Sequence, residues 1–315
     1  MENKLIVSSS PHTRTPETIE SIMTDVLIAL FPVALVSVLL FGYQALLTIV
    51  IGTLAAMVTE ALILRKKDIF GDGSAAVTGL LLALTLPPAP PWWVVVIGSV
   101  VAIGIGKHVY GGLGNNLFNP ALVGRAVLLI SWGTNLAGDV WALPQPFAFT
   151  ADVSAVTAAT PLVTQDVTLF ELFLGNINGS LGEVSALALI IGALWLFYKG
   201  HIDWRIPGGF IGAVFVLGFL LGGGAYENAL MTGLFHVLAG GVLLGAFFMA
   251  TDMVTSPVTP RGRLIYGIGC GVVTMLVRLY GGYPEGVTFG ILLMNGLTPL
   301  IDNLTVPRKF GEVKK

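Results

Sequence analysis

Cysteine and charge are both scarce in this sequence. Its only cysteine, Cys270, lies in an apolar run, so the chain has neither a disulfide framework nor the cysteines for an iron–sulfur centre of its own. A redox role would therefore need a cofactor that cysteine does not hold. Charged residues make up 11% of the chain, against roughly 25% in soluble domains, and hydrophobic residues make up 55%. This composition is typical of an integral membrane protein.

Several classes of site are also missing. The sequence contains no cluster of metal ligands, no glycine-rich phosphate loop and no pairing of a nucleophile with a base, so it predicts neither a metal site nor a catalytic residue. The net charge of −2 argues against a nucleic-acid partner. Residues 1–20 lack the pattern of a signal peptide and favour a short cytoplasmic tail.

Apolar segments follow one another along the chain, and a helix that spans the bilayer needs about 20 mainly apolar residues. We expect ten segments: 22–41, 45–64, 74–86, 92–106, 119–132, 184–198, 208–221, 229–250, 264–279 and 286–301. Segment 74–86 is too short for a full crossing and stops at Pro87, which indicates a half-helix. A short interfacial helix is expected over 169–174.

The basic residues predict the orientation of these segments. With the N-terminus in the cytoplasm, 14 of the 16 basic residues fall on the cytoplasmic side, and the other two, Arg125 and Arg278, lie within segments. Because basic residues concentrate in cytoplasmic loops, this distribution predicts a multi-pass protein of the cell membrane with both termini inside. It places the loop between residues 133 and 168, which contains no Lys or Arg, on the outside.

Two related strings indicate an internal repeat. Lys107-His-Val-Tyr-Gly-Gly is similar to Arg278-Leu-Tyr-Gly-Gly, and each precedes the last helix of its half. Each half also has an interruption near proline, at 86–88 in the first half and at 255–260 in the second. Five helices per half require opposite orientations, so we expect an all-α membrane fold of two inverted five-helix repeats with broken half-helices.

This fold divides the chain into five parts. They are a cytoplasmic tail (1–20), the first repeat (21–133), an extracytoplasmic loop (134–182), the second repeat (183–303) and a second cytoplasmic tail (304–315).

Two charged residues are candidates for a binding site. Arg125 lies in an otherwise apolar helix, where a cation faces either a bound anion, such as a phosphate or a flavin edge, or a structural carboxylate partner. Asp252, within Thr251-Asp-Met-Val-Thr-Ser-Pro257, offers a carboxylate beside hydroxyls for a cofactor or a cation. Helix capping explains the same cluster equally well.

The loop before Pro161 gathers hydroxyl side chains among small residues. Ser154, Thr157 and Thr160 lie in Asp152-Val-Ser-Ala-Val-Thr-Ala-Ala-Thr-Pro161, and Pro161 disfavours helical geometry at Thr160. We therefore expect Thr160 at an exposed turn, where its hydroxyl can carry a phosphoester. A solvated connecting loop has the same composition.

Four strings, taken together, resemble one membrane family. They are Gly111-Gly-Leu-Gly-Asn-Asn-Leu-Phe-Asn-Pro-Ala-Leu-Val-Gly-Arg125, Ala159-Thr-Pro-Leu162, Ala250-Thr-Asp-Met-Val-Thr-Ser-Pro257 and Gly281-Gly-Tyr-Pro-Glu-Gly286. The family contains the D subunit of Rnf-type electron-transport complexes and the B subunit of sodium-translocating NADH:quinone reductase. The resemblance runs from the first helix to about Asp302. The short N-terminal tail favours the former, because the B subunit carries a longer extension.

The resemblance implies a component of an ion-translocating ferredoxin:NAD+ oxidoreductase that is inactive alone and works with the A, B, C, E and G subunits. It also implies FMN bound covalently through a phosphoester to the last Thr of a Ser-Gly-Ala-Thr-like motif, attached by an exported flavin transferase. The matching residue is Thr160, although the motif here reads Thr157-Ala-Ala-Thr160 and Asp152 stands further upstream than usual. A second, non-covalent flavin (riboflavin) is allowed by analogy, with Arg125 and Asp252 as candidates for its surroundings.

Two alternatives remain open at this point. Inverted repeats with broken helices also build channels and small-solute transporters that hold no cofactor. Within the family, the chain is alternatively a B-type component of the quinone reductase.

Overall fold

In the computed structural model, residues 17–65, 70–136, 161–164, 167–175, 177–222, 226, 228–281 and 285–307 are described, and all regular structure among them is helical. The first helices are α1 (Ile19–Leu64), α2 (Ser74–Leu84), α3 (Trp92–Val101) with the π-helical η1 (Ala102–His108), α4 (Pro120–Trp132) with the 3₁₀ turn η2 (Gly133–Asn135), and the short α5 (Pro161–Thr164) and α6 (Leu169–Leu174). The later ones are α7 (Ala186–Lys199), α8 (Arg205–Leu221), α9 (Ala229–Leu238), α10 (Val242–Leu244) with the π-helical η3 (Gly245–Met249), α11 (Pro260–Tyr280) and α12 (Val287–Leu304).

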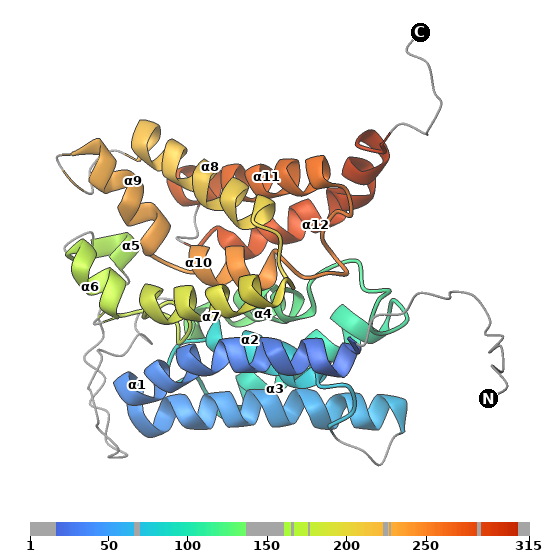
Figure 1. Cartoon of the computed structure of the whole chain (residues 1–315). Coiled ribbons are helices and arrows are strands. Elements are labelled where there is room, and N and C mark those ends of the chain that lie inside the picture. The colour runs from blue at the N-terminus through green and yellow to red at the C-terminus, as the bar shows by residue number, and fades with distance from the viewer. Residues whose placement is uncertain are drawn as a thin grey trace, which may run out of the picture.

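The helices form two layers with a seam between them. Figure 1 shows α1–α3 in one layer and α8, α9, α11 and α12 in the other, while α4, α7 and α10 lie between. Within the first layer α1 packs against α2 and α3, and α3 and η1 pack against α4. In the second layer α8 packs against α9 and α11, and α11 packs against α12. In each layer one helix, α1 or α8, thus packs against two others.

Helix α1 contains two of the expected segments in one 46-residue element. Its two arms lie side by side in Figure 1 and meet at Gly42, whose φ of 65° is not helical. Glycine adopts this left-handed geometry without steric cost, which permits the tight turn. The predicted hairpin of segments 22–41 and 45–64 is therefore confirmed.

The boundaries of other helices follow local rules of capping. Asn119 caps α4 by accepting hydrogen bonds from the backbone N–H groups of Ala121 and Leu122, and Pro120 takes the first helical position. Thr259 and Pro260 begin α11 in the same way. Thr168 and Glu171 form a capping box at α6, which confirms the short helix expected over 169–174.

The second half is broken at a different place from the one predicted. Residues 255–260 do not interrupt a helix, because Pro260 starts α11. The expected continuous segment 229–250 is instead two helices, α9 and α10–η3, bent by 62°. Gly240 in the break has a φ of +70°, which is again a geometry that glycine adopts readily.

Backbone contacts join the halves at their broken helices. The segment that precedes α7 donates from Leu181 N to Leu86 O (3.0 Å) and from Gly182 N to Leu84 O (2.6 Å), beside the end of α2. The side chain of Asn119 donates to Met249 O at 3.1 Å. These hydrogen bonds tie the end of α2 to the segment before α7, and the start of α4 to the end of η3.

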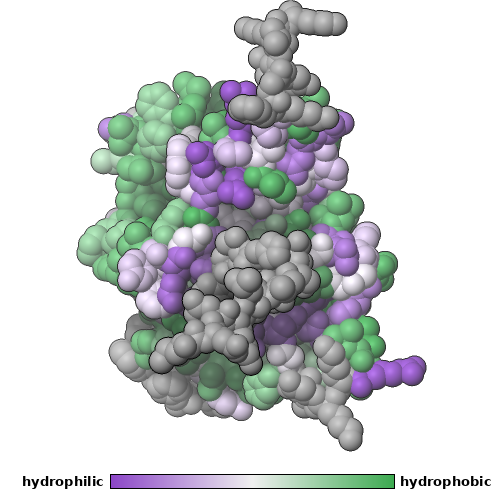
Figure 2. Space-filling model, turned by 45° about the vertical axis from the view of Figure 1, so that its right-hand side comes forward, coloured by the Kyte–Doolittle hydropathy of each residue, from purple (hydrophilic) through white to green (hydrophobic). Residues whose placement is uncertain are grey.

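Length and composition of the described helices suit a bilayer. Three of them (α1, α11 and α12) are long and apolar enough to cross one, and the bent pair α9 and α10–η3 makes a fourth candidate. Five further apolar helices are 10–17 residues long. In Figure 2 hydrophobic residues cover the left flank of the surface, whereas most hydrophilic residues lie across the middle and right of the view. These features support a membrane protein.

Candidate functional site

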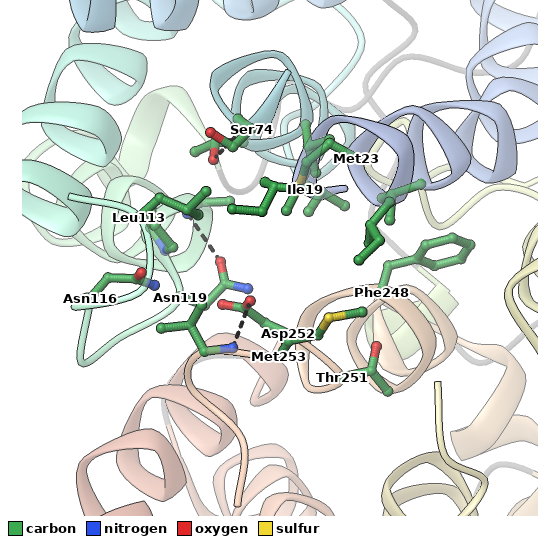
Figure 3. A pocket seen from close by; sticks show the side chains of 18 of the residues that line it. Ile19, Met23, Ser74, Leu113, Asn116, Asn119, Phe248, Thr251, Asp252 and Met253 are labelled. Carbon is green, nitrogen blue, oxygen red and sulfur yellow. Dashed lines mark hydrogen bonds between the residues drawn. The ribbon is translucent and has the colours of Figure 1, made fainter. Parts of the chain in front are cut away.

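A pocket of about 270 Å³ lies between the two halves of the molecule. Its walls come from α1, α2, η1, the loop before α4, and the segment after η3 (Figure 3). Most of its lining is apolar, and its polar members are Ser74, Thr78, Lys107, Asn116, Asn119, His201, Thr251 and Asp252. We call it the interface pocket.

Two polar residues of the interface pocket are fixed by their own segments. Asn119 uses its side-chain oxygen to cap α4 and its amide to hold Met249 O. Asp252 accepts from the backbone N–H of Val254 (3.3 Å) and from the hydroxyl of Thr255 (3.2 Å). Both side chains point into the pocket in Figure 3. Asp252 thus holds a turn between η3 and α11 and caps neither helix, because Thr259 is the N-cap of α11, and the same carboxylate also lines a cavity.

A buried cation forms another part of the pocket wall. The Nζ of Lys107 lies 2.5 Å from Glu60 Oε1 and 2.5 Å from Ser74 Oγ, and the Lys107 side chain is 2% exposed. His108 approaches the same carboxylate at 3.1 Å. Glu60 is thus a partly buried carboxylate that faces the Lys107 cation and the His108 ring. The charge pattern places Lys107 at the cytoplasmic surface and does not reveal its burial, because its partner lies 47 positions away.

A second, smaller cavity lies between the end of α2 and the bend that separates α9 from α10. Its volume is about 20 Å³, enough for about one water molecule, and Thr85, Arg125, Glu183, Gly241 and Glu285 are among its lining residues. Arg125 is 1% exposed and donates from Nη2 to Glu285 Oε2 at 2.9 Å. The structural partner considered for Arg125 is therefore present, and it joins α4 to the start of α12.

Arg278 of α11 binds the backbone at the bend between α9 and α10. Its guanidinium donates from Nη1 to His236 O (2.6 Å) and from Nη2 to Ala239 O (2.9 Å), next to Gly240. It also lies within electrostatic range of Glu183 and Glu285. Arg125, Arg278, Glu183 and Glu285 form a cluster of two guanidinium groups and two carboxyl groups. Arg125 and Glu183 are far in sequence from the other two, so no local pattern predicts that all four meet.

The structure separates the two residues considered for a non-covalent flavin. Asp252 lines the interface pocket, whereas Arg125 lines the smaller cavity and has a carboxylate partner. One planar ligand in the interface pocket would therefore contact Asp252 and not Arg125. The predicted involvement of Arg125 in that site is not supported.

Ser154, Thr157 and Thr160 lie outside the described residues, and so does Asp152. The residues that follow Thr160 in sequence are described. Leu162 of α5 packs against a cluster that includes Leu172 and Phe235. A Cβ added at Gly240 would lie 2.9 Å from Leu162 Cδ1 and 2.7 Å from Arg278 Nη2. Helix α5 thus rests on the break in the second half, beside a cation.

One acidic side chain outside the helices carries a shifted pKa. Asp203, between α7 and α8, is partly buried, and burial by itself would raise the pKa of its carboxyl group. Hydrogen bonds from the backbone and guanidinium of Arg205 and from Arg263 outweigh that effect and hold the pKa of Asp203 below its usual value. Ion pairs of Asp203 with Arg205 and Arg263 therefore join the start of α8 to the start of α11.

The family described as "NQR2, RnfD, RnfE family" matches residues 6–311. The chain belongs to this family. The D subunit of the proton-translocating ferredoxin:NAD(+) oxidoreductase complex of Clostridium ljungdahlii is 46% identical over 98% of this chain and 97% of its own length. The D subunit of the Na(+)-translocating ferredoxin:NAD(+) oxidoreductase complex of Acetobacterium woodii is 45% identical over 99% of this chain and 97% of its own length.

A more distant relative carries a less specific name. The D subunit of an ion-translocating oxidoreductase complex of Halorhodospira halophila is 40% identical over 97% of this chain and 95% of its own length. The expected resemblance to D subunits of Rnf-type complexes is therefore confirmed over nearly the whole chain.

Proposed function

We propose that this chain is the D subunit of an ion-translocating, Rnf-type ferredoxin:NAD+ oxidoreductase complex. The observation that carries this proposal is the identity of 45–46% with two proteins of that name, over 98–99% of the chain. The single buried cysteine supports a division of labour, because iron–sulfur centres must then come from partner subunits. The A, B, C, E and G subunits are the proposed partners, and the chain is inactive alone.

FMN attached covalently to Thr160 is the first cofactor in this proposal. A bound flavin supplies one- and two-electron chemistry, and this chain contributes its attachment and surroundings. The hydroxyl of Thr160, the small residues before it and the positive charge of Arg278 near α5 all suit a phosphoester. An exported flavin transferase attaches the group, with Ser154 and Thr157 in the segment that it would recognise.

A second, non-covalent flavin in the interface pocket is the next part of the proposal. The apolar walls suit an isoalloxazine ring, and Asn119, Thr251 and Asp252 offer donors and acceptors to its polar edges. A volume of about 270 Å³ is close to the lower end for ligand sites, roughly 300 Å³. Riboflavin, which carries no phosphate, suits a pocket whose described cation, Lys107, already faces Glu60.

We infer a membrane topology of ten segments in two inverted repeats, with both termini in the cytoplasm. Similar neighbours in the two layers, the short helix α2 in the first half and the bent pair α9 and α10–η3 in the second support the repeat. The distribution of basic residues supports the orientation, which places the Thr160 loop outside. Ion movement would couple to electron transfer if the flavin's oxidation states favour different conformations of the halves, since a ligand shifts states only through differential binding.

The test is intact-mass and peptide mass spectrometry of the chain co-expressed with its flavin transferase. We expect an FMN adduct on the peptide that contains Thr160, fluorescent in a denaturing gel, and its loss in Thr160→Ala. Thr164→Ala is the matched control and should keep the adduct, because Thr164 lies outside the motif Thr157-Ala-Ala-Thr160, whose last Thr accepts the phosphoester. An unmodified wild-type peptide, with the transferase shown to act on another target, would favour a cofactor-free channel.

A further inference from the structure

An open apolar groove runs along α8 on the outer surface of the second half. It has a volume of about 520 Å³, and α7, α8, α9 and η3 contribute its walls. Four aromatic side chains line it: Phe197, Trp204, Phe215 and Phe247. Phe197 and Phe247 meet edge to face, with ring centroids 6.3 Å apart, and form its floor near one end. We call this feature the α8 groove.

Two glycines keep the α8 groove open. Gly208 and Gly212 lie one helical turn apart on its lining. A Cβ at Gly212 would meet no described atom within 4 Å, and one at Gly208 would meet only the Trp204 ring of its own helix. The described part of the chain therefore leaves this face of α8 uncovered.

The α8 groove continues into a polar pocket at the start of α8. The polar pocket has a volume of about 530 Å³ and shares Phe197 and Trp204 with the groove. His201, Asp203, Thr251, Ser256 and Arg263 supply its polar lining. The α8 groove and the polar pocket thus meet at Trp204, and tryptophan is typical of the membrane–water interface.

Asp203 and Arg263 of the polar pocket form a cluster with Arg205, which lies beside the pocket, and this cluster has a surplus of positive charge. Arg205 Nη1 and Arg263 Nη1 both pair with one carboxylate oxygen, Asp203 Oδ2, at 2.7 and 3.1 Å. Each arginine side chain is about one third exposed, and the Arg205 guanidinium also stands 5.6 Å from the Trp204 ring centroid. Two cations that share one anion leave a net positive charge open to a further anionic group.

We propose that the α8 groove and the polar pocket together bind one anionic phospholipid. An acyl chain lies in the groove over Gly208 and Gly212, and the phosphate headgroup meets Arg263 in the polar pocket. The surplus positive charge favours an anionic phospholipid, because a purely apolar helix of a neighbouring subunit would carry no anionic group to pair with Arg263. Lipid binding at this surface does not depend on the redox function.

The test uses the purified, delipidated full chain and native mass spectrometry. It is titrated with phosphatidylglycerol and with phosphatidylcholine that carry identical acyl chains. We expect one saturable phosphatidylglycerol adduct at lower lipid concentration than the phosphatidylcholine adduct. Arg263→Gln should weaken phosphatidylglycerol binding about fivefold, the factor for one basic residue at an anionic lipid surface. Arg261→Gln is the matched control, because Arg261 is exposed on the same first turn and has no ion pair among the described residues.

A second pair of variants tests the groove itself. Gly212→Leu fills the α8 groove, its Cβ meets no described atom, and it should abolish the saturable adduct. Gly296→Leu, at an exposed glycine of α12 whose added Cβ would lie 3.5 Å from Phe118, should keep it. An independent experiment uses the wild-type chain and phosphatidylglycerol with a photoactivatable acyl chain. This lipid should label peptides of α8 and α9.

Three results would overturn the proposal. Equal affinity for the two lipids would remove the headgroup role of Arg263. Labelling away from α7, α8, α9 and η3 would place the acyl chain elsewhere. Retention of the adduct in Gly212→Leu, with loss of a neighbouring subunit from the purified complex, would assign the groove to a partner helix.

Discussion

At the scale of single residues, the two halves are joined by a buried ion pair whose members are distant in sequence. Arg125 and Glu285 come from different halves and lie together where water is nearly excluded. Removal of one partner leaves the other charge uncompensated, which costs about 3–5 kcal/mol for a buried pair. We expect Glu285→Gln to lower the free energy of unfolding by roughly that amount.

A double-mutant cycle measures this pair directly. Thermal unfolding in detergent of Arg125→Met, Glu285→Gln and the double variant should be strongly non-additive, with the double variant more stable than the sum of losses implies. Glu20→Gln, at an exposed residue in the first turn of α1, serves as the control and should change little. Additive losses would mean that Arg125 relies on other groups.

Asp203 gives a pH-dependent prediction at the same scale. Because its pKa is lowered in the folded chain, its ion pairs stabilise the fold at neutral pH, and this stabilisation is lost as the pH falls through the lowered pKa. Asp203→Asn should therefore be less stable than wild type at neutral pH. The difference in melting temperature should shrink below about pH 4. A difference that stays constant into the acid range would show that the carboxylate acts through packing.

At the scale of helices, hydropathy and capping residues predict most boundaries, and glycine geometry accounts for the exceptions. The proline-rich stretch 255–260 resembles an interruption, yet Pro260 fits the first turn of α11, where its missing N–H costs nothing. The true break at Gly240 lies within small apolar residues and interrupts no hydropathy pattern. Only the three-dimensional backbone reveals its positive φ.

Close helix contacts in this protein also depend on glycine. A Cβ at Gly79 of α2 would lie 2.6 Å from Gly52 O and 2.8 Å from Ala56 Cβ, so α2 and α1 would have to separate. We expect Gly79→Ala to destabilise the fold by about 1–3 kcal/mol, the usual cost of overpacking. Gly212→Ala is the matched control and should be neutral or stabilising by up to about 1 kcal/mol, because its Cβ meets nothing and alanine favours helix. Equal effects on thermal unfolding would contradict the packing argument.

At the scale of the whole molecule, composition identifies the membrane class, and sequence motifs identify the family. What they do not predict is which distant side chains share a cavity. The sequence predicts one flavin site with both Arg125 and Asp252, but the two residues line separate cavities. Lys107 and Glu60 meet across 47 positions through the packing of η1 on α1. Such pairings depend on tertiary structure, which local patterns do not encode.

The orientation across the membrane is the last global property to test. Cys270 is fully buried, so a Cys270→Ser background provides a chain to which single cysteines can be added. We expect Asp152→Cys to react with a membrane-impermeant maleimide in intact cells and Arg261→Cys to react only after the membrane is opened. The reason is that basic residues stay on the cytoplasmic side, whereas the loop around Asp152 has none. Reaction of Asp152→Cys only after the membrane is opened would place the Thr160 loop in the cytoplasm, where an exported transferase cannot reach it.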